Sequence, residues 1–203
     1  MLASGLTGCT GAAAPQPGAA PVAGTGAPVI VPGAPGDRGR VATPGERVGE
    51  PESGASAGDV LFTERMIPHH RQALEMAGLA PDRTTTAAVL GLCRRITAGQ
   101  GPEIEVMSRW LLAQGQEVPA GHGHEPDPAY GMASLAEMNR LRAARGTEFD
   151  ALLLHLMIRH HEGALRMAGE EIAQGGDQLL LKMAGDIASG QRAEIVRMRR
   201  LLN

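Results

Sequence analysis

The distribution of apolar side chains changes abruptly at residue 59. From Thr10 to Gly58 the chain is rich in Ala, Pro and Gly and contains almost no large apolar residues. Such a composition cannot bury enough apolar surface to fold, so residues 10–58 are predicted to form a disordered linker. From residue 59 onward, apolar residues recur with the period of about 3.6 that marks amphipathic helices.

This periodicity predicts four long helices and one short helix. Glycine and proline disfavour helix interiors, so Pro68 should bend the first helix, and the run from Gly99 to Pro102 should kink the second. Thr147 is the predicted N-cap of the third long helix. The long helices are expected over 59–80, 84–114, 147–173 and from about 178 nearly to 203, and the short one over 132–145.

A helical wheel of the first helix, at about 100° per residue, has one apolar stripe. Arg65, Arg71, Gln72 and Glu75 lie outside it. Both histidines of a His-His doublet lie inside it and are therefore predicted to face the interior. The full stripe comprises Asp59, Phe62, Met66, His69, His70, Ala73, Met76 and Ala77.

The doublet belongs to a pattern that the chain contains twice. The form M-I-x-H-H-x-x-A-L-x-M-A occupies 66–77 and again 157–168, a separation of 91 residues. Asp59 matches Asp150 at the same spacing, and Glu103 matches Glu194. A repeat of this length without gaps indicates a duplicated structural unit. We therefore expect repeat 1 over 59–114, a crossover over 115–146 and repeat 2 over 147–203.

Two helical hairpins, each with one apolar face, can bury those faces against each other. The predicted fold is therefore all-α: a four-helix bundle made of two repeated αα-hairpins, with a pseudo-twofold relation and a short crossover helix. Aromatic residues make up only 2% of the chain, so the core must consist of Leu, Met, Ala and Ile. Residues 59–203 are expected to form one domain.

Charge and hydropathy argue against nucleic acid as a partner and against a membrane-spanning helix. The net charge of −3 provides no basic surface of the kind that nucleic-acid-binding proteins use. After the first residues, no stretch approaches the roughly 20 apolar residues of a membrane span.

The two cysteines lie in different surroundings and are not expected to pair. Leu6-Thr7-Gly8-Cys9 resembles the lipobox of bacterial lipoproteins, and a tether follows it. Only eight residues precede Cys9 and none is basic, so this interpretation requires a translation start further upstream; the alternative is an accidental match. We interpret residues 1–9 as a signal remnant with Cys9 lipidated and the protein held at the membrane outside the cytoplasm. Cys93 is predicted to be buried.

The candidate metal ligands are the four doublet histidines and the methionine that precedes each doublet. Imidazole and thioether together suit copper, because the soft sulfur favours Cu(I) and imidazole binds both oxidation states. The alternative is a hydrogen-bonded histidine network without metal. The six residues are His69, His70, His160, His161, Met66 and Met157.

A second group of candidates is less distinctive. Methionine fills core gaps as readily as it binds metal, and an inward carboxylate can be a ligand, a partner of His or Arg, or partly exposed. Counting equal steps along the first hairpin places Glu103 roughly 9 Å from the His69 layer, so the glutamates are predicted to reach histidines only across the bundle. Gln100 and Gln191 are expected to close such a network. The group consists of Glu103, Glu194, Met76, Met167, Met107 and Met198.

The segment from Glu148 to Ala168, with its core Met157-Ile158-Arg159-His160-His161, resembles the bacterial domain-of-unknown-function 305 family. The resemblance covers residues 59–203 and includes both doublets. It implies a ferritin-like helical bundle in an extracytoplasmic or lipid-anchored protein, and some members of the family are linked to copper binding and resistance. This chain has only His122 and His124 in its crossover loop and lacks a dense Met/His tract, which disfavours high-capacity copper storage.

Three functions remain open. The first is copper binding, buffering or delivery without turnover. The second is a ferritin-like dimetal oxidase with Glu103 and Glu194 as bridging ligands, although the chain lacks the Glu-x-x-His motif of such sites. The third is a structural or interaction module whose histidines form a buried network or a pH switch. We assign no catalytic residues, and the sequence identifies no protein partner.

Overall fold

The computed structural model describes residues 24, 28–31, 38–45, 55–120 and 128–202. The chain divides into two compact units, 1–52 and 53–203. Five α-helices lie in the described part of the second unit, which confirms the predicted all-α fold. They are α1 (Ala57–Gly78), α2 (Ala87–Ala113), α3 (Leu135–Ala143), α4 (Gly146–Gln174) and α5 (Gln178–Leu202), with the 3-10 helices η1 (Ala80–Asp82) and η2 (Pro128–Tyr130).

Residues 1–9 and most of the predicted linker lie outside the described residues. Where the first unit is described, two short strands depart from the expectation of no regular structure. β1 (Ile30–Val31) pairs antiparallel with β2 (Arg40–Val41). The β-branched residues explain the local preference for strand. Ile30 and Val41 both remain more than half exposed, so the pair adds little buried surface.

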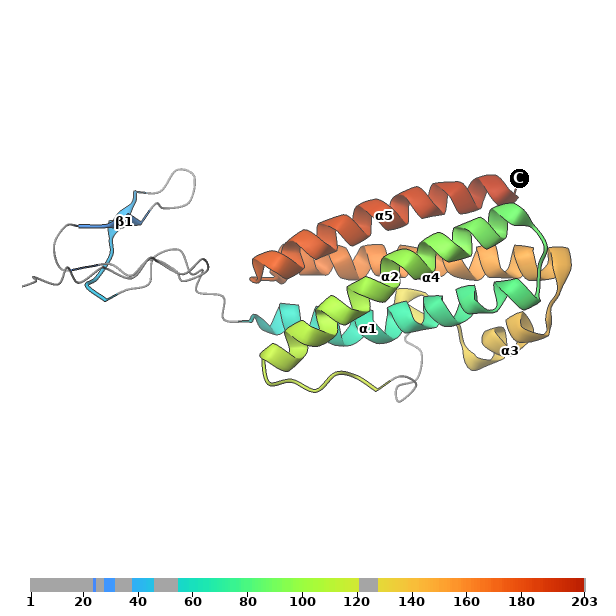
Figure 1. The fold of residues 1–203 in the computed structure, drawn as a ribbon, viewed down its shortest axis with the longest axis horizontal. Helices are drawn as coiled ribbons and strands as arrows, with labels where there is room; N and C mark the ends of the chain where they lie inside the picture. The colour runs from blue at the N-terminus through green and yellow to red at the C-terminus, as the bar shows by residue number, and fades with distance from the viewer. Residues whose placement is uncertain (1–23, 25–27, 32–37, 46–54, 121–127, 203) are drawn as a thin grey trace, which may run out of the picture. The chain divides into compact units, whose positions relative to one another are not determined.

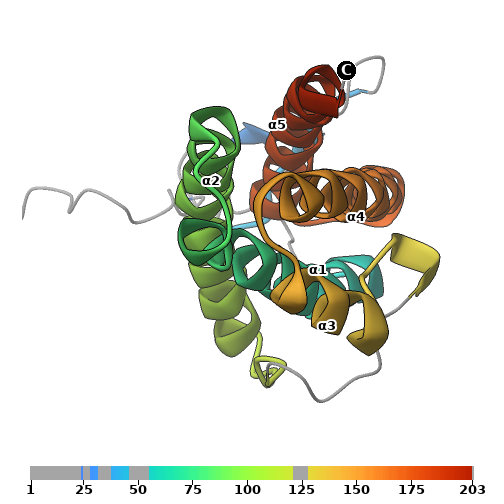
Figure 2. The same ribbon diagram turned by 90° about the vertical axis from the view of Figure 1, so that its right-hand side faces the viewer.

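The four long helices are arranged as two hairpins. α1 packs on α2, α4 packs on α5, and the hairpins meet chiefly along α1 and α4 (Figure 1). In the view along the helices, α1, α2, α4 and α5 surround a common interior, while α3 lies outside it beside α1 and α4 (Figure 2). The helix termini differ from the expected bounds by only a few residues.

The core consists of two apolar clusters separated by the histidines. One cluster includes Met76, Leu92 and Phe149, and the other includes Met66 and Trp110. Along α1 and α4 the doublets lie where one cluster gives way to the other. Most of the buried residues are Leu, Met, Ala and Ile, as the composition predicts.

Pro68 and Pro102 lie inside α1 and α2, which continue through both residues. The bend at Pro68 and the kink before Pro102 stay predictions. One local expectation needs correction. Thr147 is not an N-cap, because α4 begins one residue earlier, at Gly146. The amide of Gly146 donates to the carbonyl of Arg83, and this tertiary contact sets where the helix begins.

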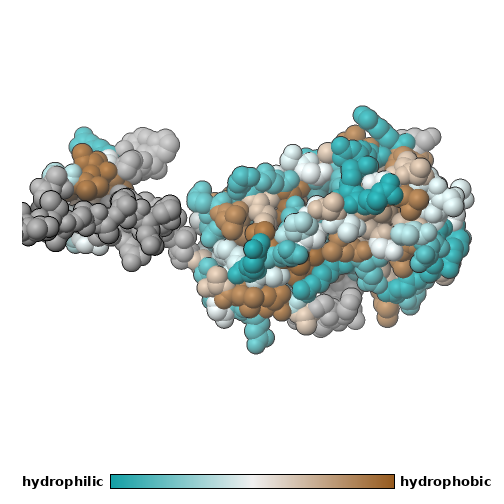
Figure 3. Space-filling model, viewed as in Figure 1, coloured by the Kyte–Doolittle hydropathy of each residue, from teal (hydrophilic) through white to brown (hydrophobic). Residues whose placement is uncertain are grey.

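The exposed surface of the helical unit mixes hydrophilic and hydrophobic residues (Figure 3). None of the helices in the described residues is long and apolar enough to cross a membrane.

Each hairpin contacts the turn of the other through an aspartate at the repeat start. Asp59 at the start of α1 accepts hydrogen bonds from the amides of Gly176 and Asp177, which connect α4 to α5. Its repeat partner Asp150 accepts a hydrogen bond from the hydroxyl of Thr86, which precedes α2. Thr86 and Asp177 are themselves 91 residues apart. The two aspartates therefore make reciprocal contacts between the hairpins.

Asp59 has a second buried carboxyl group beside it. Burial by itself would raise the pKa of Asp59, but hydrogen bonds from Ser56 and from the Asp177 backbone lower it to about 2. Burial and the neighbouring Asp59 raise the pKa of Glu171 to about 8. At neutral pH, Glu171 therefore holds a proton, and both of its carboxyl oxygens are buried without a hydrogen-bond partner in the described part of the molecule.

This pair predicts that thermal stability declines between about pH 5 and pH 8. Because the pKa of Glu171 is raised on folding, the folded state binds more protons than the unfolded state in that window, and stability falls as pH rises through it. Glu171→Gln should flatten the decline, because the amide stays neutral. Unfolding temperatures measured across this range test the prediction. Glu148→Gln on the exposed side of α4 should keep the wild-type slope, and a wild-type profile without a decline would contradict the prediction.

Candidate metal centre

The two doublets meet at the centre of the helical unit. His69 on α1 and His160 on α4 stack on each other, with ring centroids 3.6 Å apart and an interplanar angle of 27°. The rings of His160 and His161 are 6.3 Å apart. All four doublet histidines are at most 1% exposed. The first histidines of the two repeats thus form a stacked pair in the interior, a contact that the sequence did not predict.

The second histidine of each doublet binds a glutamate of its own hairpin. His70 Nε2 lies 2.8 Å from Glu103 Oε2, and His161 Nε2 lies 2.8 Å from Glu194 Oε2. The two pairs occupy equivalent repeat positions. Their glutamates are partly exposed, at 27% and 15%, while both imidazoles are fully buried. Each carboxylate therefore reaches inward from the bundle surface.

These pairs correct the prediction that the glutamates would reach histidines only across the bundle. Counting equal steps from the turn assumes a tight turn and parallel helix axes. In the structure, the connection from Leu79 to Thr86 contains η1 and an extended stretch, and α2 crosses α1 obliquely (Figure 1). Glu103 is therefore brought level with His70 although it lies further from the turn in sequence.

Burial keeps the stacked imidazoles neutral. Desolvation lowers the pKa of His69 to about 3, although a hydrogen bond to the backbone of Tyr130 opposes the shift. Desolvation and the neighbouring histidines hold the pKa of His160 well below its usual range. A neutral imidazole keeps a ring-nitrogen lone pair, which a metal ligand requires.

Several buried ring nitrogens make no hydrogen bond in the described part of the molecule. They are Nδ1 of His69, His70 and His161 and both nitrogens of His160. The buried amides of Gln100 and Gln191 likewise make none, so they do not close the histidine network as expected. Buried polar atoms without partners are rare in folded proteins and often mark a site for an ion or ligand.

The candidate methionines are all buried but do not form one group. Met66 precedes His69 by one turn on α1, and Met157 precedes His160 by one turn on α4, so each shares a helix face with its doublet. Both are fully buried. The other four are divided between the two apolar clusters, Met107 and Met167 in one and Met76 and Met198 in the other.

This donor set fits a soft ion with few ligands. No group of three or more His, Cys, Asp or Glu side chains able to hold a metal occurs in the described ranges. A carboxylate-bridged pair of metals would need such a group, whereas Glu103 and Glu194 each bind a separate histidine. Neutral imidazoles and thioethers in a dry interior instead suit Cu(I).

The crossover segment reaches the four buried doublet histidines, which we call the histidine layer. The sequence did not predict this contact. The carbonyl of Tyr130 in η2 accepts a hydrogen bond of 3.0 Å from His69 Nε2. The approach depends on Gly163 of α4: a Cβ atom there would lie 1.5 Å from the Tyr130 carbonyl oxygen. Gly131 follows with a φ of +72°, and a Cβ there would lie 2.2 Å from the Arg159 carbonyl oxygen.

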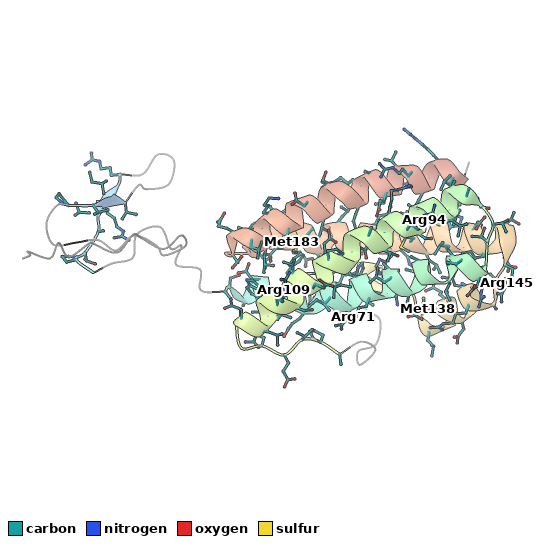
Figure 4. The ribbon with its side chains drawn as sticks, viewed as in Figure 1. Arg71, Arg94, Arg109, Met138, Arg145 and Met183 are labelled. Carbon is teal, nitrogen blue, oxygen red and sulfur yellow. The ribbon has the colours of Figure 1, made fainter. Side chains whose placement is uncertain are left out.

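Differences between the repeats would have indicated this docking site. Gln72, the counterpart of Gly163, holds the Ala133 backbone by two hydrogen bonds. Arg159, the counterpart of Pro68, binds Glu137 and the Gly131 carbonyl. Arg71 projects toward the coil after α2 (Figure 4) and donates to the Pro119 carbonyl. Several positions at which the two copies of the motif differ therefore contact the crossover.

Four further residues were singled out from the sequence. Cys93 is a buried free thiol, as predicted, and burial raises its pKa to about 11. Cys9, His122 and His124 lie outside the described residues.

Comparison with solved structures identifies similar folds. A DUF305 protein from Streptomyces coelicolor, predicted to be secreted, is 28% identical with a TM-score of 0.66, covering 71% of this chain and 91% of its own. A DUF305 fragment from Deinococcus radiodurans is 30% identical with a TM-score of 0.67, covering 73% and 97%. CopM in its Cu(II)-bound form is 29% identical with a TM-score of 0.62, covering 71% and 95%.

CopM has also been solved in Cu(I)-bound and silver-bound forms. A comparison with curated proteins finds no match. The model of the domain of unknown function DUF305 matches residues 59–202, a span that contains both doublets, both glutamates and the crossover. The protein therefore belongs to the DUF305 family.

Proposed function

We propose that this protein binds copper in its buried histidine layer, and that it buffers or delivers the ion outside the cytoplasm without catalysing a reaction. The observation that carries the proposal is the set of unpartnered ring nitrogens in four buried histidines. An interior that excludes water leaves these lone pairs costly unless an ion or a polar ligand uses them.

The relatives support copper as the ion. CopM, solved with Cu(I), Cu(II) and silver, matches over most of its own length at 29% identity. Silver is a soft monovalent ion like Cu(I), and thioethers prefer such ions. The resemblance to a protein predicted to be secreted supports a location outside the cytoplasm. Lipidation of Cys9 stays a prediction.

The proposed ligands are His69, His70, His160 and His161, with Met66 and Met157. In the proposal, Met76, Met107, Met167 and Met198 are core residues, because none of them lies one turn before a doublet. Copper, when bound, would hold the facing helices together through their side chains. The proposed scaffold is a four-helix bundle of two repeated hairpins, over 59–114 and 147–203, joined by the crossover at 115–146.

Cu(I) titration of the metal-free full chain, in competition with a chromophoric chelator, tests the proposal. Wild type should retain Cu(I), and a variant with all four doublet histidines changed to alanine should not. His155→Ala is the matched control, because it removes an exposed histidine from α4. Replacing only His69 and His70 should cost more than half of the binding, since each doublet supplies part of one interior.

A conservative double variant keeps the test informative if the variant without the four histidines misfolds. Met66→Leu combined with Met157→Leu preserves apolar volume, a swap that costs less than about 1.5 kcal/mol of stability. It should weaken Cu(I) binding while leaving the helical circular dichroism unchanged. Wild-type protein that binds no Cu(I) and shows no thermal shift with copper would reject the proposal and favour a hydrogen-bonded histidine network.

A further inference from the structure

Three oxygen acceptors each contact one of the buried histidines, and in every case the contact is made with the Nε2 nitrogen of that ring. Nε2 of His69 meets the Tyr130 carbonyl, Nε2 of His70 meets Glu103, and Nε2 of His161 meets Glu194. In all three rings the other nitrogen, Nδ1, is buried without a partner. The acceptors come from three different elements, η2, α2 and α5, so the common orientation does not follow from the sequence repeat alone.

The chemistry of the acceptors decides the tautomer of each ring. A peptide carbonyl can only accept a hydrogen bond, so His69 must carry its proton on Nε2. A carboxylate likewise accepts, which places a proton on Nε2 of His70 and of His161. Each of the three rings therefore carries a proton on Nε2, and among the described residues Nδ1 is the nitrogen left without a partner.

We propose that Glu103, Glu194 and the Tyr130 carbonyl are positioning groups, each of which orients one histidine so that Nδ1 is the nitrogen left for an ion. The ion itself rests on the proposed function. In metal sites, an acceptor on the outer nitrogen of a ligating histidine fixes the ring and makes the free nitrogen more basic. This changes the role of both glutamates: they are partners of the ligands, not ligands.

His160 differs from the other three histidines. Among the described residues neither of its ring nitrogens has a hydrogen-bond partner, and it stacks on the anchored ring of His69. The asymmetry arises because the crossover supplies a carbonyl to His69 of repeat 1 and no equivalent to His160. The layer thus has three rings of fixed tautomer and one ring that can use either nitrogen.

Long-range ¹H–¹⁵N NMR of the metal-free full chain tests the tautomers without any metal. His69, His70 and His161 should each show a protonated Nε2 and an unprotonated Nδ1. Protonated Nδ1 in any of the three would overturn the assignment for that ring. This result is independent of copper binding, so failure of the proposed function and failure of the tautomer assignment are distinguishable.

Side-chain variants test whether the glutamates position the rings. Glu103→Ala combined with Glu194→Ala should weaken Cu(I) binding by about 10- to 100-fold, the usual effect of losing such partners, and should mix the tautomers of His70 and His161. Glu103→Gln combined with Glu194→Gln keeps a carbonyl acceptor on each side chain and should restore the Nε2–H tautomers and most of the affinity. Glu105→Ala is the control, because Glu105 is an exposed glutamate on the same helix and, among the described residues, its side chain pairs with no histidine.

Two outcomes separate positioning from the other roles. Wild-type affinity in the double alanine variant would refute positioning even if copper binds. A loss that glutamine does not rescue, with tautomers unchanged, would assign the carboxylates to the ion as ligands and equally overturn the proposal.

Discussion

Gly163→Ala is expected to destabilise the metal-free protein by about 3 kcal/mol, the upper range for overpacking a tightly filled site. The added Cβ would lie 1.5 Å from the carbonyl oxygen of Tyr130, which is backbone and cannot rotate away. The segment from Pro128 to Gly131 must therefore move off α4. That movement breaks the hydrogen bond from His69 Nε2 and strains the contacts of Arg65 and Arg166 with the Tyr130 ring.

Chemical unfolding of the two glycine variants measures this effect. Gly169→Ala is the matched control: it lies on the same helix, is exposed, and has nothing within 4 Å of an added Cβ. It should stabilise the protein by up to about 1 kcal/mol, the helix preference of alanine over glycine. If both variants behave alike, the close approach of the crossover to α4 is wrong. Only Gly163→Ala should also break the hydrogen bond that keeps the proton of His69 on Nε2, so that the ring no longer holds a single tautomer.

Asp59→Ala is expected to have an effect of similar size, about 3 kcal/mol, because an unpaired buried N–H costs about 1–3 kcal/mol. The fully buried carboxylate accepts from the amides of Gly176, Asp177 and Ser56. Removing it leaves those donors without an acceptor. The connection between α4 and α5 would then lose its attachment to α1.

The repeat supplies the control for this variant. Asp150→Ala removes the equivalent aspartate, which accepts from a single side chain, the Thr86 hydroxyl. We expect a cost of about 1 kcal/mol, typical of one hydrogen bond. Because the pKa of Asp59 is lowered to about 2, its contribution is present above about pH 4 and is lost as pH falls toward 2. Denaturant unfolding should show a smaller difference in stability between wild type and Asp59→Ala at pH 3 than at pH 7. Equal costs of Asp59→Ala and Asp150→Ala at pH 7 would contradict the asymmetry.

The burial of the four histidines could be predicted, because the two copies of the motif carry the same residue types at the same helical spacing. Periodicity placed His69, His70, His160 and His161 on inner faces, and the structure buries all four. The identity of their partners was not predictable. Glu103 meets His70 because α2 crosses α1 at an angle, and a count of residues from the turn contains no crossing angle.

The crossover illustrates a second limit. Tyr130, Gly131 and Gly163 have no repeated pattern, and their role appears only where the two copies differ. A single glycine in a helix can be a weak point or a contact point, and the sequence offers no means to distinguish them. The structure does so, because a carbonyl oxygen occupies the space of the missing side chain.

The sequence by itself determined which side chains face the interior, because the 3.6-residue period assigns each side chain to a helix face. The 91-residue repeat adds that the apolar faces of the two copies are equivalent and can pack against each other. Only the tertiary structure decided how those faces meet. It stacked His69 on His160, gave each glutamate a histidine of its own hairpin, and brought a backbone carbonyl from the crossover to one ring of the four. The reason is physical: periodicity is a property of one helix, whereas hydrogen-bond partners depend on the angles and offsets between helices, which the packing of all side chains sets together.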